Sequence, residues 1–214
     1  MSIRLAARWF FDVVSPFSYL HLSQFDRVHS SLEMELVPVL FAGLLRHWGS
    51  KGPAELPSKR IHTYRYCTWA ASKLGIPFRM PPRHPFNSLP TQRLLVALRA
   101  GRSHVQTAFD FIYGQGRDPE HEWASLCNAL GSIDADVACG DPSVKQRLIT
   151  NTEAAARAGV FGVPTFVVRD QLFWGGDTID WMNAFVEDAG MFEREEMRRV
   201  ADLEFGAHRL RRTG

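Results

Sequence analysis

The chain has 214 residues, 45% of them hydrophobic, and its 25 basic and 23 acidic residues leave a net charge of +2. A chain of this length forms one large domain or a domain with a sizeable insertion. The balanced charge argues against a general nucleic-acid binder, which carries a basic stripe. Because no apolar stretch is long enough to span a bilayer and Met1–Leu5 lacks the features of a signal peptide, we expect a cytoplasmic protein with no nucleic-acid or membrane partner.

The three cysteines, Cys67, Cys127 and Cys139, are odd in number and form no C-x-x-C pair. This pattern favours neither a disulfide framework nor a zinc site. The eight histidines show no metal-ligand spacing either. We therefore expect buried, small apolar cysteines and no bound metal.

The N-terminal part predicts a strand, a helix and a second strand. The apolar run Trp9–Val14 is typical of a buried strand. Ser15 is a favoured N-cap, and the helix that follows it, about Pro16–His29, begins with a proline in the first position. Met34–Leu40 predicts the second strand, and Pro38 places the end or the edge of a sheet there. A strand–helix–strand unit this short implies parallel strands with a right-handed crossover.

The middle of the chain predicts mainly helices. Residues 48–57 have the composition of a loop, and Ser58 can cap a helix over Lys59–Leu74 that Gly75 ends. Pro81–Asn87 predicts another loop. The expected helices beyond it are Thr91–Ala100, His104–Gly114, Glu122–Leu130, Ile133–Cys139 and Pro142–Gly159.

Strand character returns near the C-terminal end. Thr165–Val168 and Leu172–Trp174 predict a β-hairpin. Asp177 can cap a final helix over Thr178–Glu187. The tail Met191–Arg212 is amphipathic and favours a helix.

The order of these elements describes an α/β protein. A βαβ unit, a run of helices and a ββα unit together make a thioredoxin-like fold that a helical domain interrupts. We assign residues 1–45 and 155–190 to the thioredoxin-like domain, residues 46–154 to the inserted helical domain and residues 191–214 to a C-terminal helical tail.

A proline immediately before the third predicted strand is the second informative feature. In a thioredoxin-like fold the Val163–Pro164 position carries a cis peptide, which would turn the Val163 N–H and C=O outward. These groups would then pair with an extended, peptide-like ligand, as an added strand would. The alternative is an ordinary trans proline at the start of a strand.

Three segments together resemble a known family. Phe11–Leu20, Gly159–Thr165 and Phe173–Asp177 are similar to segments of the 2-hydroxychromene-2-carboxylate isomerases. This family belongs with the kappa-class glutathione transferases and the DsbA-like thioredoxin superfamily. The resemblance runs from about Trp9 to Phe185, and the three motifs occur in the same order as in the family.

The resemblance implies glutathione as the cofactor and Ser15 as the catalytic residue. Ser15 stands where DsbA-like oxidoreductases carry their first cysteine, and it would hold the glutathione thiolate. A hydroxyl donor at a helix N-terminus favours a charged sulfur. The alternative role for Ser15 is a plain N-cap. Because Ser15–Ser18 contains no sulfur, a disulfide oxidoreductase is the weakest interpretation.

The resemblance also implies which residues bind the cofactor: Lys59, Val163, Pro164, Gly176 and Asp177. Val163, before the cis proline, would pair with the cysteinyl backbone. Gly176 and Asp177 would bind the γ-glutamyl carboxylate and ammonium, unless Asp177 is only a helix cap. Lys59 would face the glycyl carboxylate, and its alternative is an exposed lysine at a helix start.

An aromatic substrate would need an apolar pocket. Our candidates for substrate binding are Phe17, Trp48, Ser50, Asn87 and Trp174. Ser50 stands where relatives often have an asparagine, so the substrate contact at this position differs from theirs. For Trp9 we expect core packing instead, and for His62, His84 and His121 surface or packed positions.

The resemblance implies a glutathione-dependent cis–trans isomerase that acts on an aromatic substrate with an enone or pyruvoyl side chain, in the breakdown of aromatic compounds. In the family mechanism the thiolate adds to the conjugated system, a bond rotates and elimination follows. Relatives are often homodimers. One alternative is a kappa-type glutathione transferase or peroxidase, and the other is a thioredoxin-fold binding protein without catalysis.

Overall fold

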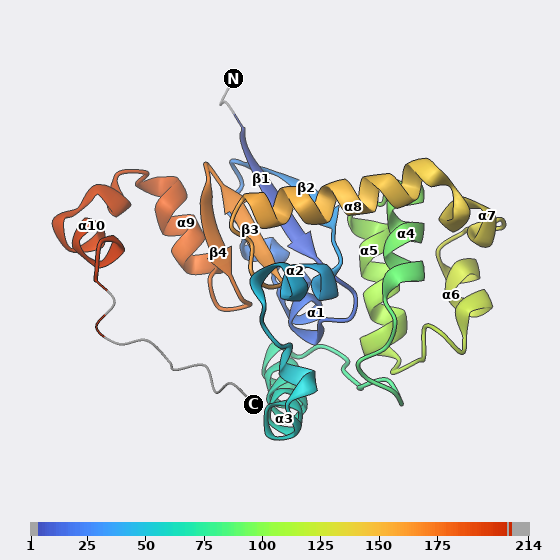
Figure 1. Ribbon diagram of the computed structural model, residues 1–214. Helices are drawn as coiled ribbons and strands as arrows, with labels where there is room; N and C mark the ends of the chain where they lie inside the picture. The colour runs from blue at the N-terminus through green and yellow to red at the C-terminus, as the bar shows by residue number, and fades with distance from the viewer. Residues whose placement is uncertain (1–3, 205, 207–214) are drawn as a thin grey trace, which may run out of the picture.

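A four-stranded mixed sheet forms the centre of the computed structural model, which describes residues 4–204 and 206 (Figure 1). The strand order is β2-β1-β3-β4. β1 (Leu5–Phe11) pairs in parallel with β2 (Leu32–Pro38) and antiparallel with β3 (Thr165–Val168). β4 (Gln171–Trp174) completes the hairpin with β3. The predicted parallel pair and hairpin are confirmed, and Pro38 ends the edge strand β2 as expected.

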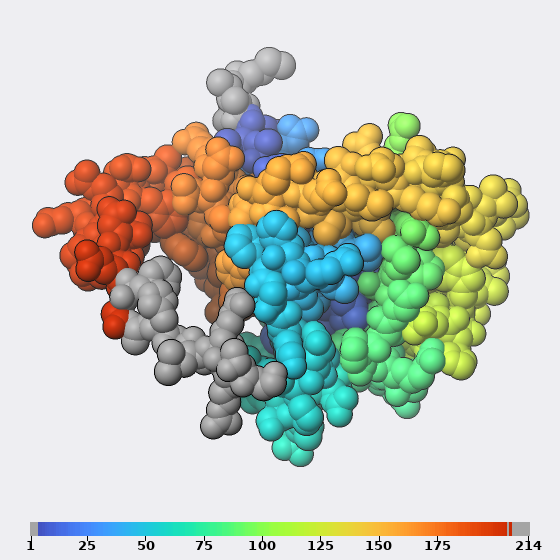
Figure 2. Space-filling model, viewed as in Figure 1, coloured from blue at the N-terminus to red at the C-terminus, as the bar shows by residue number. Residues whose placement is uncertain are grey.

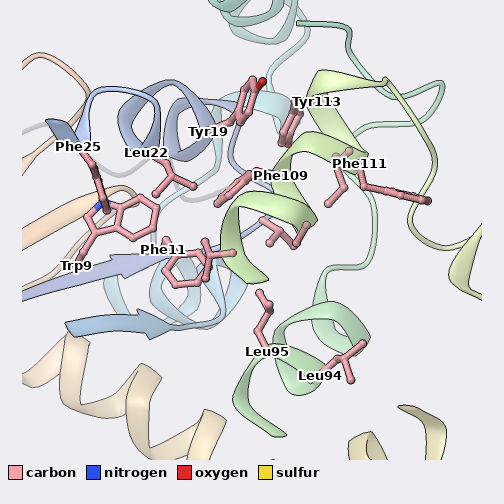
Figure 3. Packing of buried hydrophobic residues seen from close by; sticks show 14 of the residues in the cluster. Trp9, Phe11, Tyr19, Leu22, Phe25, Leu94, Leu95, Phe109, Phe111 and Tyr113 are labelled. Atoms are coloured by element: carbon pink, nitrogen blue, oxygen red, sulfur yellow. The ribbon is translucent and has the colours of Figure 1, made fainter. Parts of the chain in front are cut away.

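Alternating side chains of β1 point to opposite faces of the sheet. Ala7, Trp9 and Phe11 belong to the larger hydrophobic cluster, whereas Phe10 belongs to a second cluster on the other face. The larger cluster is rich in stacked aromatic rings, and Trp9 and Phe11 lie parallel with centroids 4.7 Å apart (Figure 3). Trp9 is fully buried, so its predicted role in the core is confirmed.

Helices cover both faces of the sheet. α1 (Pro16–Leu22) and α9 (Ile179–Glu187) contribute Leu22, Met182 and Phe185 to the larger cluster. α2 (Phe41–Trp48) and α8 (Pro142–Arg157) cover the opposite face with Leu44, Ala155 and Ala156. α8 crosses the molecule above α2 in Figure 2.

Most of the remaining helices gather at one end of the sheet, and α3 lies below it (Figure 1). Leu94, Leu95, Phe109 and Phe111 pack into the larger cluster, so this helical part shares its core with the sheet (Figure 3). The helices are α3 (Pro57–Leu74), α4 (Leu89–Ala97), α5 (Arg102–Phe109), which continues as a π-helical turn over Asp110–Gly114, α6 (Trp123–Ala129) and α7 (Ala135–Gly140).

This order of elements confirms the predicted thioredoxin-like α/β fold with a helical insertion. The predicted domain boundary at residue 155 falls inside α8, so the division into domains stays a prediction. After α9, the chain forms a short 3₁₀ turn over Met191–Glu193 and α10 (Glu195–Ala201). The rest of the predicted tail helix, from residue 205, lies outside the described residues apart from Gly206. Among the residues described, no helix has the length and apolar character to cross a membrane.

Several predicted boundaries were wrong. The first strand ends at Phe11, and the helix after Ser15 ends at Leu22 because the chain turns at Ser23 into a separate 3₁₀ turn over Phe25–Arg27. α2 was not predicted. α3 begins at Pro57, so Ser58 lies inside the helix and does not cap it.

Candidate functional site

The Ser15 hydroxyl lies at the end of the turn that connects β1 to α1. Ser15 is the N-cap of α1, and its Oγ accepts a hydrogen bond from the Ser18 N–H at 3.3 Å. The same oxygen donates to the Val163 carbonyl, also at 3.3 Å. Ser15 is therefore both a cap and a contact to the loop before β3. Because α1 has only seven residues, the hydroxyl matters more here than a helix dipole.

The Val163–Pro164 peptide is cis, as the sequence predicted. Within the described part of the chain, no hydrogen bond satisfies the Val163 N–H or the buried Ser18 hydroxyl. The Pro164 carbonyl accepts from the Gly175 N–H at 3.0 Å, so the turn after β4 lies beside the cis proline. Two predicted cofactor residues, Gly176 and Asp177, follow in that turn.

Three exposed aromatic residues surround the loop before Pro164, and we call Trp48, Phe161 and Trp174 the aromatic rim. The Trp48 indole donates to the Val160 carbonyl at 2.9 Å. Phe161 and Trp174 lie 5.0 Å apart, and each is about half exposed. Gly162 leaves room for the Trp174 indole, since a Cβ at position 162 would lie 2.6 Å from the Trp174 Nε1. Two predicted substrate residues, Trp48 and Trp174, thus lie against the loop before Val163, and Phe161, which was not predicted, packs on Trp174.

Other predicted site residues are not brought to Ser15 by any hydrogen bond or ion pair among the residues described. Lys59, on the first turn of α3, and Ser50 are both exposed. The side-chain Oδ1 of Asn87 accepts from the Leu89 N–H at 3.1 Å, which is a local turn contact. Phe17 lies half-buried against Tyr66 of α3, with centroids 6.0 Å apart.

Asp177 does not cap α9, so that prediction was wrong. The N-cap is Thr178, and its hydroxyl donates to the Gly175 carbonyl at 3.0 Å. The Asp177 carboxylate is exposed and accepts no hydrogen bond from the described residues. A free carboxylate beside the cis proline suits a cationic ligand group.

A buried carboxylate supports the Ser15 corner, and the sequence analysis assigned it no role. Asp12 Oδ1 accepts from the Val14 N–H at 3.0 Å, and Oδ2 accepts from the Phe41 N–H at 2.8 Å and the Ser88 hydroxyl at 3.1 Å. Burial raises the pKa of Asp12 to about 6, although all three donors favour the ionised form. An acidic residue at the end of an apolar run was the signal that could have identified it.

The peptide before Ser15 is held by side chains that were also missed. The Val14 carbonyl accepts from Tyr113 Oη and from His84 Nε2, each at 2.7 Å. Tyr64 of α3 lies 2.7 Å from His84 Nδ1. No pattern in the sequence connects these three positions, because they meet only through the tertiary fold.

The cysteines do not take part in this arrangement. Cys67, Cys127 and Cys139 are all buried and free, as predicted. Burial raises the pKa of the Cys67 thiol to about 12 and that of Cys127 to about 11. These thiols stay protonated at neutral pH, so a reactive sulfur at Ser15 has to come from a ligand.

Comparisons with known proteins agree with the fold. A DSBA-like thioredoxin domain profile matches residues 8–187. Glutathione S-transferase kappa 2 of Caenorhabditis elegans is 29% identical over 212 residues, covering 88% of this chain and 94% of that protein. The 2-hydroxychromene-2-carboxylate isomerase of Sphingobium xenophagum is 26% identical over 191 residues, covering 84% and 97%. A solved structure of a 2-hydroxychromene-2-carboxylate isomerase superposes with a TM-score of 0.75 at 22% identity, covering 94% of this chain and all of that one.

Proposed function

The chain belongs to the DsbA-like thioredoxin family, and on that premise we propose that it is a glutathione-dependent isomerase of aromatic substrates that carry an enone or pyruvoyl side chain. The observation that carries this proposal is the pairing of Ser15 with Val163. A hydroxyl and the edge of a cis peptide lie within 3.3 Å of each other, without a protein thiol. Relatives named as an isomerase and as a glutathione transferase support the same class of chemistry.

The residues present fit glutathione. The Val163 N–H and the Ser18 hydroxyl are polar groups without partners in the described structure, and both lie beside Ser15. Glutathione is a peptide with a thiol at its centre, so the Val163 N–H and C=O would pair with its backbone as an added strand does. Pro164 fixes the direction of that edge.

The Ser15 hydroxyl would donate a hydrogen bond to the ligand's sulfur. A hydroxyl has one proton, so this donation requires Ser15 to release the Val163 carbonyl. The present contact is 3.3 Å long, at the weak end for O–H···O bonds, so little is lost. The released Val163 carbonyl is then free to accept an N–H from the ligand backbone.

Charged groups at the edge of the site would bind the two ends of the cofactor. Asp177 and the Gly176 N–H would hold the γ-glutamyl ammonium and carboxylate, and Lys59 would face the glycyl carboxylate. Glutathione supplies a sulfur nucleophile for reversible addition to a conjugated double bond. The aromatic rim and Phe17 would enclose the ring of the substrate, with Ser50 and Asn87 as its polar contacts.

Calorimetric titration with glutathione tests the cofactor site. We expect saturable binding to the wild type and roughly tenfold weaker binding to Asp177→Ala, the usual range for one charge-assisted contact. Asp180→Ala is the matched control, because Asp180 is an exposed acid nearby whose partner is Arg27 at 2.7 Å. If the wild type fails to bind glutathione while circular dichroism shows it folded, the proposal is wrong and a non-catalytic binding role remains.

A kappa-type transferase is the second candidate, because the relative with 29% identity carries that name. Two assays with glutathione separate the candidates. Isomerisation of an aromatic enone without net consumption of glutathione supports the isomerase, whereas conjugation to an aryl halide without isomerisation supports the transferase. The homodimer, the cytoplasmic location and the role in aromatic breakdown stay predictions.

A further inference from the structure

The peptide group that precedes Ser15 is held at both ends by hydrogen bonds. Its carbonyl, on Val14, accepts from His84 Nε2 and from Tyr113 Oη, each at 2.7 Å. Its N–H, on Ser15, donates to the Asp12 backbone carbonyl at 3.0 Å, and the Val14 N–H of the preceding peptide donates to Asp12 Oδ1, also at 3.0 Å. Few loop carbonyls accept from two side chains at once, since most pair with backbone or water. The plane of this peptide sets the direction of the Ser15 backbone at the start of α1.

The His84 ring is itself held in one orientation. A carbonyl only accepts, so Nε2 carries a proton and Nδ1 of the neutral ring is an acceptor. The Tyr64 hydroxyl lies 2.7 Å from Nδ1 and 2.9 Å from the His84 carbonyl. Burial lowers the pKa of His84, which keeps the ring neutral near pH 7. A histidine whose second nitrogen is bonded keeps one tautomer and one direction.

We propose that His84, oriented by Tyr64, is a positioning residue that sets the direction of the Ser15 hydroxyl through the Val14 carbonyl. The inference rests on the proposed function and deepens it, because it assigns a residue outside the sheet to the control of the cofactor's sulfur. His84 comes from the loop between α3 and α4, and Tyr64 comes from α3. Tyr64 and His84 thus link α3 to the peptide before Ser15.

The physical argument concerns the backbone of Ser15. Ser15 has φ −91° and ψ 111°, outside the helix that it caps. Rotation of the Val14–Ser15 peptide would move Oγ relative to Val163, and a displacement of about 1 Å is enough to impair a positioned catalytic group. Without the His84 donor, only Tyr113 resists that rotation from the carbonyl side. The Ser15 hydroxyl would then stabilise a bound thiolate less well, and the thiol would keep its proton to higher pH.

Helix α3, which carries Tyr64, also carries Lys59, the proposed partner of the glycyl carboxylate. α3 would therefore contact the cofactor at one end and the serine that holds its sulfur at the other. This arrangement explains why a helix that packs mainly through Cys67 and Ala71 carries a tyrosine whose hydroxyl points to a histidine. Packing alone would be served as well by a phenylalanine at position 64.

The experiment measures the ionisation of the bound thiol rather than turnover. Wild type, His84→Leu, His84→Gln and Tyr64→Phe are each saturated with glutathione, and the ultraviolet absorbance of the thiolate is followed against pH. Gln is the conservative variant, because its side-chain N–H₂ can replace the Nε2–H donor. Tyr66→Phe is the matched control on the same helix, since no hydrogen bond of the Tyr66 hydroxyl occurs among the described residues. Calorimetry on each variant gives the affinity for glutathione.

We expect the pKa of the bound thiol to rise by roughly one unit in His84→Leu and by less in Tyr64→Phe. His84→Gln should restore most of the shift, and Tyr66→Phe should leave it unchanged. Below the pKa of the bound thiol the affinity for glutathione should change little, because neither residue touches the ligand. Above that pKa the affinity should fall by up to about tenfold, which is the linkage equivalent of one pKa unit. If His84→Leu does not fold, Tyr64→Phe still tests the inference, since it removes only one oxygen.

Two results would overturn the inference while leaving the proposed function intact. One is a wild-type thiol pKa in both His84→Leu and Tyr64→Phe. The other is a His84→Gln variant that matches His84→Leu, which would assign His84 a packing role only. Failure of the wild type to bind glutathione is a different result, because it removes the proposed function and this inference together.

Discussion

The candidate site has two sides that differ in how their groups are bonded. On the Ser15 side, Asp12, Ser15 and Tyr113 are buried and hydrogen-bonded. The buried Gln92 carboxamide donates to the Phe11 carbonyl at 2.9 Å and to the Val39 carbonyl at 2.7 Å, so it connects the end of β1 to the segment that follows β2. On the other side, formed by the loop before Pro164, the turn after β4 and the ends of α2 and α3, the charged and aromatic residues are exposed: Trp48, Lys59, Phe161, Trp174 and Asp177. Reacting groups need fixed geometry before the ligand arrives, whereas ligand-binding groups gain their partners from the ligand.

This difference separates the effects of mutation. Substitutions on the Ser15 side should change catalysis and stability together, because the buried side chains of Asp12, Ser15 and Tyr113 are hydrogen-bonded to neighbouring groups. Substitutions on the exposed side should change binding with little effect on stability. Loss of the Ser15 hydroxyl should have the largest effect, and loss of an exposed aromatic residue the smallest.

Ser15→Ala should lower turnover by roughly 100-fold, the scale reported for the loss of one positioned hydrogen-bond donor. It should also lower the free energy of unfolding by about 1 kcal/mol through loss of the N-cap. Steady-state kinetics with glutathione and an aromatic enone, together with urea denaturation, measure both effects.

Ser23→Ala is the matched control for this prediction. Ser23 lies at the other end of α1, where its hydroxyl donates to the Leu20 carbonyl at 2.8 Å. The same chemical change on the same helix should leave turnover unchanged. Near-wild-type turnover in Ser15→Ala would remove the catalytic role that we give to Ser15.

Asp12→Asn should change how stability depends on pH. Burial raises the pKa of Asp12 from its ordinary 3.8 to about 6. The stabilising contribution of this group is therefore fully present below about pH 4 and is lost as the pH rises through about 6. In the wild type this loss amounts to roughly 3 kcal/mol between pH 4 and pH 7, and Asp12→Asn should not show it. Urea denaturation across this pH range measures the difference.

Asp118→Asn is an informative control because the shift there has the opposite sign. Asp118 is also buried, but its bond with Arg83 at 2.7 Å holds the pKa of that carboxyl well below its ordinary value. Its contribution to stability is present above about pH 4 and is lost only at lower pH. Asp118→Asn should therefore keep the wild-type slope between pH 4 and pH 7. If Asp12→Asn keeps the wild-type dependence of stability on pH, ionisation of Asp12 does not destabilise the folded protein.

The N-cap at Ser15 and the cis Val163–Pro164 peptide were predicted from the sequence, but the buried groups that hold Ser15 and the exposed Phe161 were not. The Val163–Pro164 peptide and the Gly175–Asp177 turn lie in short sequence motifs, so neighbouring residues are enough to identify them. Asp12 and His84 act through partners that lie far away in the sequence, so no local pattern identifies them. His84 was interpreted as a surface or packed residue, but it bonds to the peptide before Ser15.

The fold errors have a related cause. α2 went unpredicted because Phe41–Trp48 is only eight residues long and begins without a side-chain cap. Its first N–H is satisfied by Asp12 from another part of the chain, at 2.8 Å. α1 was predicted too long, because the apolar spacing continues through Phe25 into a separate 3₁₀ turn. The first error concerns a helix start whose bond comes from a tertiary contact, whereas the end of α1 is closed by local bonds from Ser23 and Gln24 to the Leu20 carbonyl.

Trp174→Ala should have the smallest effect of the three, and it tests the exposed side. Trp174 is 51% exposed and packs on Phe161 and Gly162, so its loss should lower the free energy of unfolding by less than about 1 kcal/mol. The KM for the aromatic substrate should rise roughly tenfold with turnover little changed, because the indole contributes apolar contact area in the ground and transition states alike. Trp69→Ala removes an indole that is 56% exposed on α3 and should leave KM unchanged. A fall in turnover at constant KM in Trp174→Ala would place this residue with the Ser15 side, and the division between a fixed and an open side would then have to be redrawn.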